Sequence, residues 1–482
     1  MEMSLKRNGV LPWLYAIVFA FLAASLYGVA NNNYYVLILP WVLTIISLAL
    51  FRLDNLFWFT VFITPLSINL SKTALGIGVS LPAEPVMFGV MLVYLFKVAY
   101  DGGIDKKVLF HPISLAILFH LLWMAISSVF SEMRVVSIKH TAARFTFEMV
   151  FFYMASQIFK NHKNIYKYIW FYLIPLLMVV GYALVRHAYY GFTDKSADWV
   201  MSPFYNDHTA YAAALAFYLP VTIALLFGKF KATAKNRNYL IVSIILLVAI
   251  ILSFTRAAYV GLTLSFCVAI MFLFRIKFSL VASIFSVLLV FGIIFQNELT
   301  MELEKNREES TSNVASQLQS ITNITTDASN VERFNRWNCA FKMFKERPVF
   351  GWGPGTYAFL YAPFQVSSEK TIISTNFGDG GNAHSEILGP LAEQGLLGSI
   401  SYLLIVILVS YYSSIFISKC RNRNTKLLAI GLLLGLISYW VHGFLNNFLD
   451  TDKASVTYWG FIAALVALQV YYKENNKEEF TA

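Results

Sequence analysis

Apolar runs of roughly 17 to 23 residues recur along the whole chain, and each is long enough to cross a bilayer as a helix. Only 13% of the 482 residues are charged, whereas a soluble domain carries about 25% charged residues. The chain therefore lacks the charge needed to cover a soluble surface. Transmembrane barrel strands would need short segments of alternating polarity, which the sequence does not show. We predict an all-α polytopic membrane protein.

The apolar runs predict about 12 to 14 transmembrane helices. The first run, 11–30, follows Lys6 and Arg7, as the core of a signal peptide would. It is long for such a core, which favours a retained helix. The further predicted spans are approximately 34–51, 56–70, 83–99, 112–130, 141–159, 166–186, 209–227, 239–254, 257–274, 278–295, 396–418, 427–445 and 455–472.

The basic residues predict the orientation of these helices. The net charge of +10 comes largely from short loops and does not indicate a nucleic-acid partner. Most lysines and arginines fall on one side of the predicted bundle, near residues 97–107, 160–167, 229–237 and 419–426. Cytoplasmic loops carry such an excess of positive charge. We therefore expect both chain ends in the cytoplasm and the alternate loops on the outer face.

The predicted spans divide the chain into four parts. Residues 1–204 hold the N-terminal membrane helices, and residues 205–295 hold the central membrane helices. Residues 296–395 form one long outer segment, and residues 396–482 hold the C-terminal membrane helices and a short cytoplasmic tail. The early part of the outer segment is rich in Ser, Thr, Asn and Glu without an apolar period, which is typical of a loop.

Within the outer segment, residues 333–350 predict an amphipathic helix. Aromatic side chains recur there at a spacing of three to four residues, and Pro348 and Gly351 end the pattern. We expect this helix to lie on the membrane surface and to present Arg333 and Arg336 to lipid phosphates.

Several basic residues could hold an anionic substrate. Arg256 follows an apolar run at the outer end of a span, where it could either reach lipid headgroups or bind a diphosphate with its guanidinium fork. Arg333 and Arg336 have the same two interpretations, a solvated helix face or a phosphate site. Arg144 lies about one turn inside a span, after Lys139. This pair could bind an anionic donor substrate or a lipid headgroup.

His384 is the histidine best placed for proton transfer. It follows the flexible Gly-Asp-Gly-Gly-Asn turn at 378–382 and precedes a short helix that leads into the next span. Its imidazole would lie at the membrane–water boundary, where a pKa near neutrality lets it accept a proton from a hydroxyl. A lone histidine is more often structural. The other outer-facing histidines remain competitors: His140, His187, His208 and His442.

Other motifs do not indicate a cofactor or a metal. The Gly-Trp-Gly-Pro-Gly stretch at 351–355 follows a helix and has no Lys-Ser/Thr after it, so it predicts a turn rather than a nucleotide loop. Residues 450–452 (Asp-Thr-Asp) could hold a cation but are better explained as a turn. Zinc-ligand spacing is absent from the sequence. Cys267, Cys339 and Cys420 are predicted to lie in the membrane, outside and inside, so neither a disulfide nor a cysteine metal site is expected.

Three of these features together resemble the O-antigen ligase family. His384-Ser385, nine residues, Gly395, two residues and Gly398 resemble the family signature, although the following residue is Ser399 where the family usually has Gly, Thr or Tyr. Arg256 resembles the family's arginine at the outer end of a helix, although the Leu usually found four residues later is a Val here.

The third feature is Arg333-x-x-x-Trp337 followed by Arg-Pro-Val-Phe-Gly-Trp-Gly-Pro-Gly, which is similar to the stretch before the family's histidine. The resemblance is strong over roughly residues 205–450. The N-terminal part of the chain resembles the family only in having membrane helices.

The resemblance implies a glycosyltransferase that uses neither a nucleotide sugar nor a metal or other cofactor. The donor would be a glycan on undecaprenyl diphosphate, and the acceptor a hydroxyl of lipid A–core at the periplasmic face of the bacterial inner membrane. His384 would be the general base. Arg256 and Arg333, with Arg336, would hold the departing diphosphate, whose growing negative charge needs fixed cations. Direct displacement would invert the anomeric centre.

Two further interpretations remain open. An O-antigen or polysaccharide polymerase of the same superfamily, or a ligase that transfers oligosaccharides to protein, would share the reaction centre and differ in acceptor. A glycolipid or small-molecule transporter would instead carry charged residues along a path near the middle of the membrane. The polar groups of this sequence gather at the outer edge, which favours chemistry at the surface.

Overall fold

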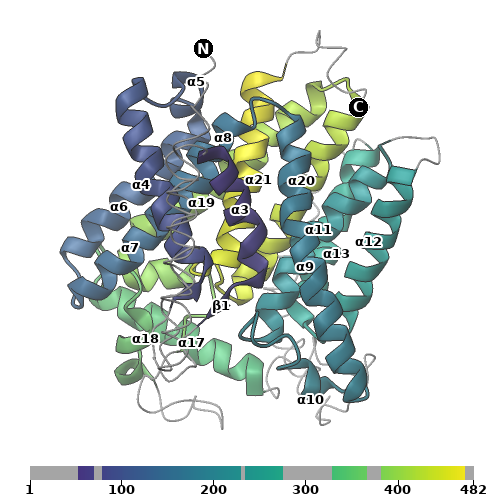
Figure 1. Ribbon diagram of the computed structural model, residues 1–482. Helices are drawn as coiled ribbons and strands as arrows, with labels where there is room; N and C mark the ends of the chain where they lie inside the picture. Colours follow the sequence, from purple (N-terminus) through teal and green to yellow (C-terminus); the bar gives the residue numbers. More distant parts are fainter. Residues whose placement is uncertain (1–52, 70–78, 229–233, 275–327, 366–380, 473–482) are drawn as a thin grey trace, which may run out of the picture.

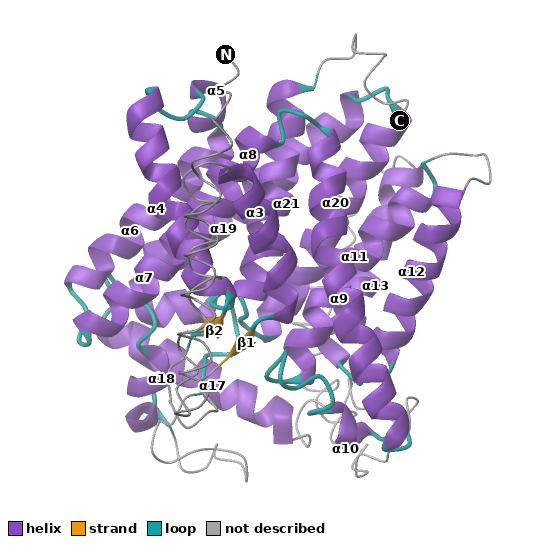
Figure 2. Ribbon diagram, in the orientation of Figure 1, coloured by secondary structure: helices purple, strands orange, loops and turns teal. Residues whose placement is uncertain are grey.

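The computed structural model describes residues 53–69, 79–228, 234–274, 328–365 and 381–472. These residues are almost entirely helical (Figures 1 and 2), as predicted. The exception is a short antiparallel pair between β1 (Ile68–Asn69) and β2 (Ser80–Leu81). The predicted spans 11–30, 34–51 and 278–295 lie outside the described residues.

Eight described helices are long and apolar enough to cross a membrane, so the chain is a multi-pass membrane protein. They are α4 (Ala83–Asp101), α6 (Pro112–Val129), α9 (Lys163–Tyr189), α11 (His208–Leu226), α13 (Arg256–Phe274), α19 (Leu388–Lys419), α20 (Arg423–Leu445) and α21 (Asp452–Tyr471). Shorter apolar helices are α3 (Leu53–Ile63), which a 3₁₀ turn extends to Leu66, and α12 (Ala234–Ile251).

The predicted span 141–159 is a composite of three segments. It begins earlier than expected, as α7 (Arg134–Glu148), passes through a π-helical turn (Met149–Met154) and ends as α8 (Ala155–Ile158). The π-helical turn and α8 are largely buried, whereas the first turns of α7 carry exposed polar residues. A π-helical turn inside a helix often accompanies a functional site, and this one lies one turn beyond the buried Arg144.

Polar loop residues fix the starts of the central helices. Asp207 caps α11 by accepting from the Ala210 N–H, Asn422 caps α20 through Thr425 N–H, and Thr451 caps α21 through Ala454 N–H. A side-chain oxygen at this position satisfies a backbone donor that the helix itself leaves unpaired. These caps set the points at which the loops become membrane spans.

The core lies where α11, α20 and α21 meet. α21 is buried along most of its length, and α20 packs against both α11 and α13. A Cβ at Gly431 would lie 2.9 Å from the Val221 Cα, and one at Gly435 would overlap the Phe217 carbonyl. Small residues let membrane helices approach this closely.

The short extramembrane elements gather at opposite ends of the bundle (Figure 1). α5 (Lys106–Leu109) lies at one end, whereas α10 (Asp194–Ala197), α17 (Ala328–Glu346) and α18 (Tyr357–Leu360) lie at the other. The second end is the one that the sequence assigns to the outer face, and we call it the α17 end.

Candidate functional site

The glycine-rich stretch at 351–355 meets the start of α19 at the α17 end. The 351–355 stretch is a turn, as predicted, with positive φ at Gly351, Gly353 and Gly355. The Trp352 N–H donates to the Ala392 carbonyl at 3.1 Å, and the Gly353 N–H donates to the Glu393 carbonyl at 2.7 Å. These bonds fasten the turn to the first helical turns of α19.

Gly395 divides α19 into the predicted short helix and the predicted membrane span. Its backbone has φ 70° and ψ −166°, a conformation that only glycine adopts readily. A Cβ there would also overlap the Val349 carbonyl. The kink lets the Leu396 N–H donate to the Pro348 carbonyl at 3.0 Å, which joins α19 to the end of α17.

His384 lies in the loop just before this short helix. Its backbone is left-handed, with φ 50°, and its N–H donates to the Asn382 Oδ1 at 3.1 Å. Burial, followed by the positive charges of Arg333 and Arg336, lowers the pKa of His384 to about 4, although a hydrogen bond with Asn446 opposes the shift. The imidazole is therefore neutral at physiological pH and can accept a proton.

Both arginines of α17 lie beside His384, but they differ in availability. Arg333 is half-buried, and its Nε donates to the Leu445 carbonyl at 3.3 Å. Arg336 is buried, pairs with Glu332 at 2.6 Å and stacks 4.0 Å from the centre of the Tyr361 ring. The expectation that Arg336 faces lipid headgroups is therefore wrong.

The reason is that the face of α17 that packs on the protein is mixed, with Asn335 and Arg336 buried beside Ala340 and Met343. Asn335, Arg336 and Cys339 are buried, whereas Phe334 and Phe341 of the aromatic stripe are 42% and 45% exposed. An exposed apolar stripe on a helix at the end of a membrane bundle suits contact with lipid. The sequence predicted the amphipathic helix, but it did not predict which face the protein would cover.

Arg256 is the first residue of α13 and is half-buried. Thr255 donates to the carbonyl of His208 at 3.3 Å. His442 of α20 lies within electrostatic range of both His208 and Arg333. These interactions relate the start of α13 only indirectly, through His208 and His442, to the region of Arg333. A helix N-terminus with an arginine on it favours an anion, since its free N–H groups and dipole add to the guanidinium charge.

Glu386, which sequence reasoning did not select, joins the His384 loop to two other segments. Its Oε1 accepts from the Tyr439 hydroxyl at 2.6 Å and from the N–H groups of Phe448 and Leu449 at 2.7 and 2.9 Å. Its own N–H donates to the Gly443 carbonyl at 2.7 Å. Burial and then the nearby Asp450 raise the pKa of Glu386. This one side chain therefore fixes both the His384 loop and the α20–α21 loop.

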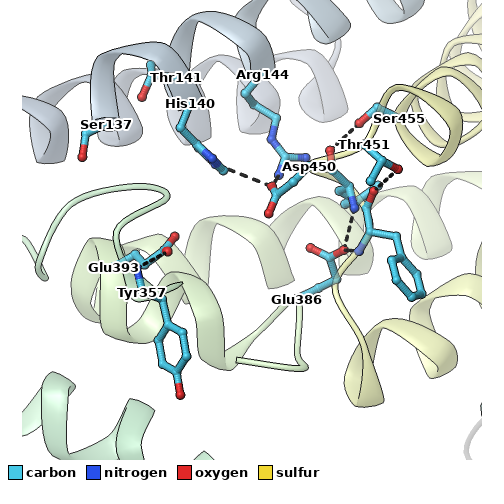
Figure 3. Close-up of polar contacts among 12 residues, drawn as sticks. Ser137, His140, Thr141, Arg144, Tyr357, Glu386, Glu393, Asp450, Thr451 and Ser455 are labelled. Carbon is cyan, nitrogen blue, oxygen red and sulfur yellow. Dashed lines mark hydrogen bonds and ion pairs between the residues drawn. The ribbon is translucent and has the colours of Figure 1, made fainter. Parts of the chain in front are cut away.

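Arg144 and His140 form a second cluster on α7 (Figure 3). Figure 3 shows both side chains directed toward Asp450 of the α20–α21 loop. The Arg144 Nη2 lies 3.0 Å and the His140 Nε2 3.6 Å from the Asp450 Oδ1. Burial lowers the pKa of His140, and Asp450 opposes that shift. Lys139, which we grouped with Arg144, is exposed on another face of the helix and does not join the cluster.

A cavity of about 150 Å³ lies between this cluster and the His384 loop. Asn382, Ala383, Ser385 and Glu386 line it, but His384 is not among the lining residues. No local sequence pattern predicts the cavity, since its walls come from α6, α7, α18, α19, α21 and three loops.

The described part of the chain contains the three cysteines and many side chains of metal-ligating types. No group of three or more His, Cys, Asp or Glu side chains there is arranged to hold a metal ion. The three cysteines are free thiols, with Cys339 and Cys420 buried and Cys267 exposed.

Comparisons with known proteins point to one family. Residues 241–403 match the family model described as O-antigen ligase. This range contains Arg256, both arginines of α17 and the whole His384 loop. An uncharacterized protein of Haemophilus influenzae is 24% identical over 242 residues, which are 49% of this chain. The alignment covers 58% of that relative's length.

Proposed function

Because residues 241–403 of this multi-pass membrane protein match the O-antigen ligase family model, we propose that it transfers a glycan from undecaprenyl diphosphate to a hydroxyl of lipid A–core. The match supports a membrane enzyme of the O-antigen ligase or polymerase type that acts on lipid-linked glycans. The donor, the acceptor and the site at the periplasmic face of the inner membrane are our proposal. Its main support is the neutral imidazole of His384 beside two arginines at the α17 end.

In the proposed reaction, His384 is the general base. The acceptor hydroxyl attacks the anomeric carbon of the donor sugar and gives its proton to the imidazole. The bond from the anomeric carbon to the diphosphate oxygen breaks, and the diphosphate leaves with the electron pair. Attack from the side opposite the leaving group inverts the anomeric configuration.

Arg256 and Arg333 are the proposed ligands of the diphosphate. Guanidinium groups bind phosphate oxygens bidentately and keep their charge at every physiological pH. Arg336 already pairs with Glu332 and rests on Tyr361, so its role in this scheme is to hold α17 and to add positive potential. The bound diphosphate would offset the positive field at His384 and raise the pKa of the imidazole, which would make it a stronger base once the donor is present.

His384→Ala tests the proposed base. We expect transfer to fall by about a hundredfold or more, since general bases contribute about 10²–10⁴ to rates. Membrane insertion and thermal stability of the variant are the controls for folding. Transfer at the wild-type rate would exclude the catalytic role of His384.

Arg256→Lys tests the diphosphate site. A lysine keeps the charge but cannot form the bidentate fork, so we expect at least about a tenfold loss of kcat/KM for the lipid diphosphate donor. Arg134→Lys, at an exposed position of α7, is the matched control and should leave kcat/KM for the donor unchanged. Full activity of Arg256→Lys would contradict diphosphate binding at this arginine.

A glycolipid gel of cells lacking the protein distinguishes ligase from polymerase. Loss of a ligase leaves bare core while the long glycan stays on its carrier. Loss of a polymerase leaves core bearing a single repeat unit. Unchanged glycolipids would contradict both functions.

A further inference from the structure

We infer that a hollow between the adjoining ends of α19, α20 and α21 binds the headgroup of an anionic phospholipid. The hollow has a volume of about 920 Å³, and we call it the basic hollow. It lies at the end of the bundle that holds α5, because the Tyr471 hydroxyl at the end of α21 donates to Asp105, which caps α5, at 2.7 Å. That end is opposite α17 (Figure 1), so the basic hollow is separate from the proposed transfer chemistry.

The charged side chains that the described residues contribute to the wall are all cations. They are Lys419 at the end of α19, Arg421 in the loop that follows, and Arg423 and Lys426 at the start of α20. No carboxylate of the described residues lines the basic hollow. Cations that converge from two helices and a loop attract an anion whose several oxygens can meet more than one of them, and a phosphate group is such an anion.

Other cations at the α5 end meet protein groups instead. The Lys160 Nζ lies 3.0 Å from the Asp105 Oδ2, and the Lys167 Nζ lies 4.2 Å from the centre of the Trp58 ring. An excess of positive charge on one side is enough to orient a membrane protein. Orientation does not require that four cations surround one hollow. Their grouping therefore indicates a ligand in addition to an orientation signal.

The position of the basic hollow favours a lipid over a soluble anion. It lies where three membrane-length helices end, which is the depth of phospholipid headgroups. On α19, Ile407 and Tyr411 are 60% and 58% exposed, and Ser418 of the hollow follows on the same face seven residues later. The rings of Phe416 and Tyr472, 5.9 Å apart, add apolar surface to the wall. A phospholipid matches both surfaces, since its phosphate meets the cations and its glycerol and acyl chains meet the apolar side chains.

The charge of the wall selects a headgroup with a net negative charge. A phosphatidylethanolamine headgroup carries an ammonium group next to its phosphate, and the wall cations repel that ammonium. A phosphatidylglycerol headgroup carries only hydroxyl groups beside its phosphate, so the attraction is not offset. Each basic residue near an anionic membrane surface strengthens binding by about fivefold. Four such residues therefore give a clear preference for the anionic lipid.

Native mass spectrometry of the full chain tests the inference. The protein would be released from micelles that hold equal amounts of phosphatidylglycerol and phosphatidylethanolamine. We expect phosphatidylglycerol to be retained at least about tenfold more than phosphatidylethanolamine, with a preference that falls as the concentration of ammonium acetate rises. Equal retention of the two lipids would overturn the inference.

Lys419→Gln combined with Lys426→Gln is the key variant, because it removes two cations from the wall. We expect retention of phosphatidylglycerol to fall about tenfold or more. Lys106→Gln combined with Lys107→Gln is the matched control, since it removes the same charge from exposed positions of α5 that do not line the basic hollow. This control should retain the lipid. Equal loss in both variants would show a general effect of surface charge and would contradict a site.

Lys419→Arg combined with Lys426→Arg keeps both charges and separates lipid binding from folding. It should retain phosphatidylglycerol as the unchanged chain does. Phosphatidylglycerol should also raise the temperature of thermal unfolding of the unchanged chain and of this variant, since a ligand that binds only the folded state stabilises it. Loss of lipid binding in a folded Arg variant would contradict recognition by charge.

Two other occupants would give different results. Inorganic phosphate should not displace phosphatidylglycerol, and displacement at millimolar concentrations would show that the basic hollow binds a free anion. The segment after Tyr472 carries Glu474, Glu478 and Glu479. If phosphatidylglycerol binds only after all three are changed to Gln, this segment is the occupant and the lipid assignment is wrong. None of these measurements uses transfer activity, so the lipid site and the proposed function stand or fail separately.

Discussion

At the scale of single residues, the setting of His384 determines its chemistry. A half-buried imidazole beside two arginines is held neutral, and the pKa falls from the ordinary 6.5 to about 4. Such an imidazole is always available as a base at neutral pH, but it is a weak one in the free protein. The proposed donor supplies the missing negative charge, so substrate binding and base strength would be coupled.

This coupling predicts different pH profiles for the two kinetic constants. The profile of kcat/KM reports the free protein, so its acid limb should lie near pH 4, where His384 becomes protonated. The profile of kcat reports the bound state, in which the diphosphate raises the pKa, so its acid limb should lie at higher pH. Initial rates of transfer between pH 3.5 and 8 provide the measurement. Coincident limbs would contradict the coupling.

The lowered pKa of His384 also makes the free energy of unfolding depend on pH. Above pH 6.5 His384 is neutral in both the folded and the unfolded chain. As the pH falls from about 6.5 through about 4, the unfolded chain binds the proton first, so this histidine's contribution to the free energy of unfolding is lost in that window. The pH profile should therefore be measured with a parallel check that the protein remains folded.

At the scale of elements, the kink in α19 connects the site to the membrane. Gly395 ends the short helix that follows His384 and starts the membrane span. The turn at 351–355 is bonded to the backbone of this short helix, and α17 ends against the kink. The site thus depends on one backbone conformation that an L-residue does not adopt readily.

Gly395→Ala should therefore destabilise the protein by roughly 2 kcal/mol or more, since a positive φ and an overlap with the Val349 carbonyl both oppose a Cβ. Thermal unfolding in detergent would measure the change. Gly181→Ala in α9 is the matched control, because a Cβ there meets no atom within 4 Å. It should leave stability unchanged or slightly raised, since alanine favours helix more than glycine does. Equal stability of the two variants would show that the kink is not needed.

At the scale of the whole molecule, the bundle has two chemically different ends. The basic loops that the sequence assigns to the cytoplasm include α5, which lies opposite the α17 end (Figure 1). The His384 loop lies beside α17, at the α17 end. This arrangement suits an enzyme that meets lipid-linked substrates on one face of the membrane.

Cysteine labelling tests this sidedness. Glu132→Cys lies at the α17 end and Lys106→Cys at the α5 end, each in a chain whose three native cysteines are replaced by alanine. A membrane-impermeant maleimide added to spheroplasts should label position 132 but not position 106. Labelling of both positions after lysis is the control for accessibility. The reverse pattern would place the site on the cytoplasmic face.

The sequence by itself determined the multi-pass helical fold and the approximate positions of the eight described membrane-length helices, because hydrocarbon thickness fixes the length of apolar runs. It also determined α17, the turn at 351–355 and the short helix after His384, since aromatic periodicity and glycine spacing are local signals. The proposed roles of His384 and the arginines remain predictions from the sequence.

Only the tertiary structure decided which face of α17 is buried, that Arg144 pairs with Asp450, and that Glu386 fixes the His384 loop. Arg144 and Asp450 are 306 residues apart, so no local pattern relates them. Their pairing depends on how α7 packs beside the α20–α21 loop. Burial, and with it the charge state of each titratable group, depends on such long-range contacts, and a periodic pattern in one segment does not carry that information.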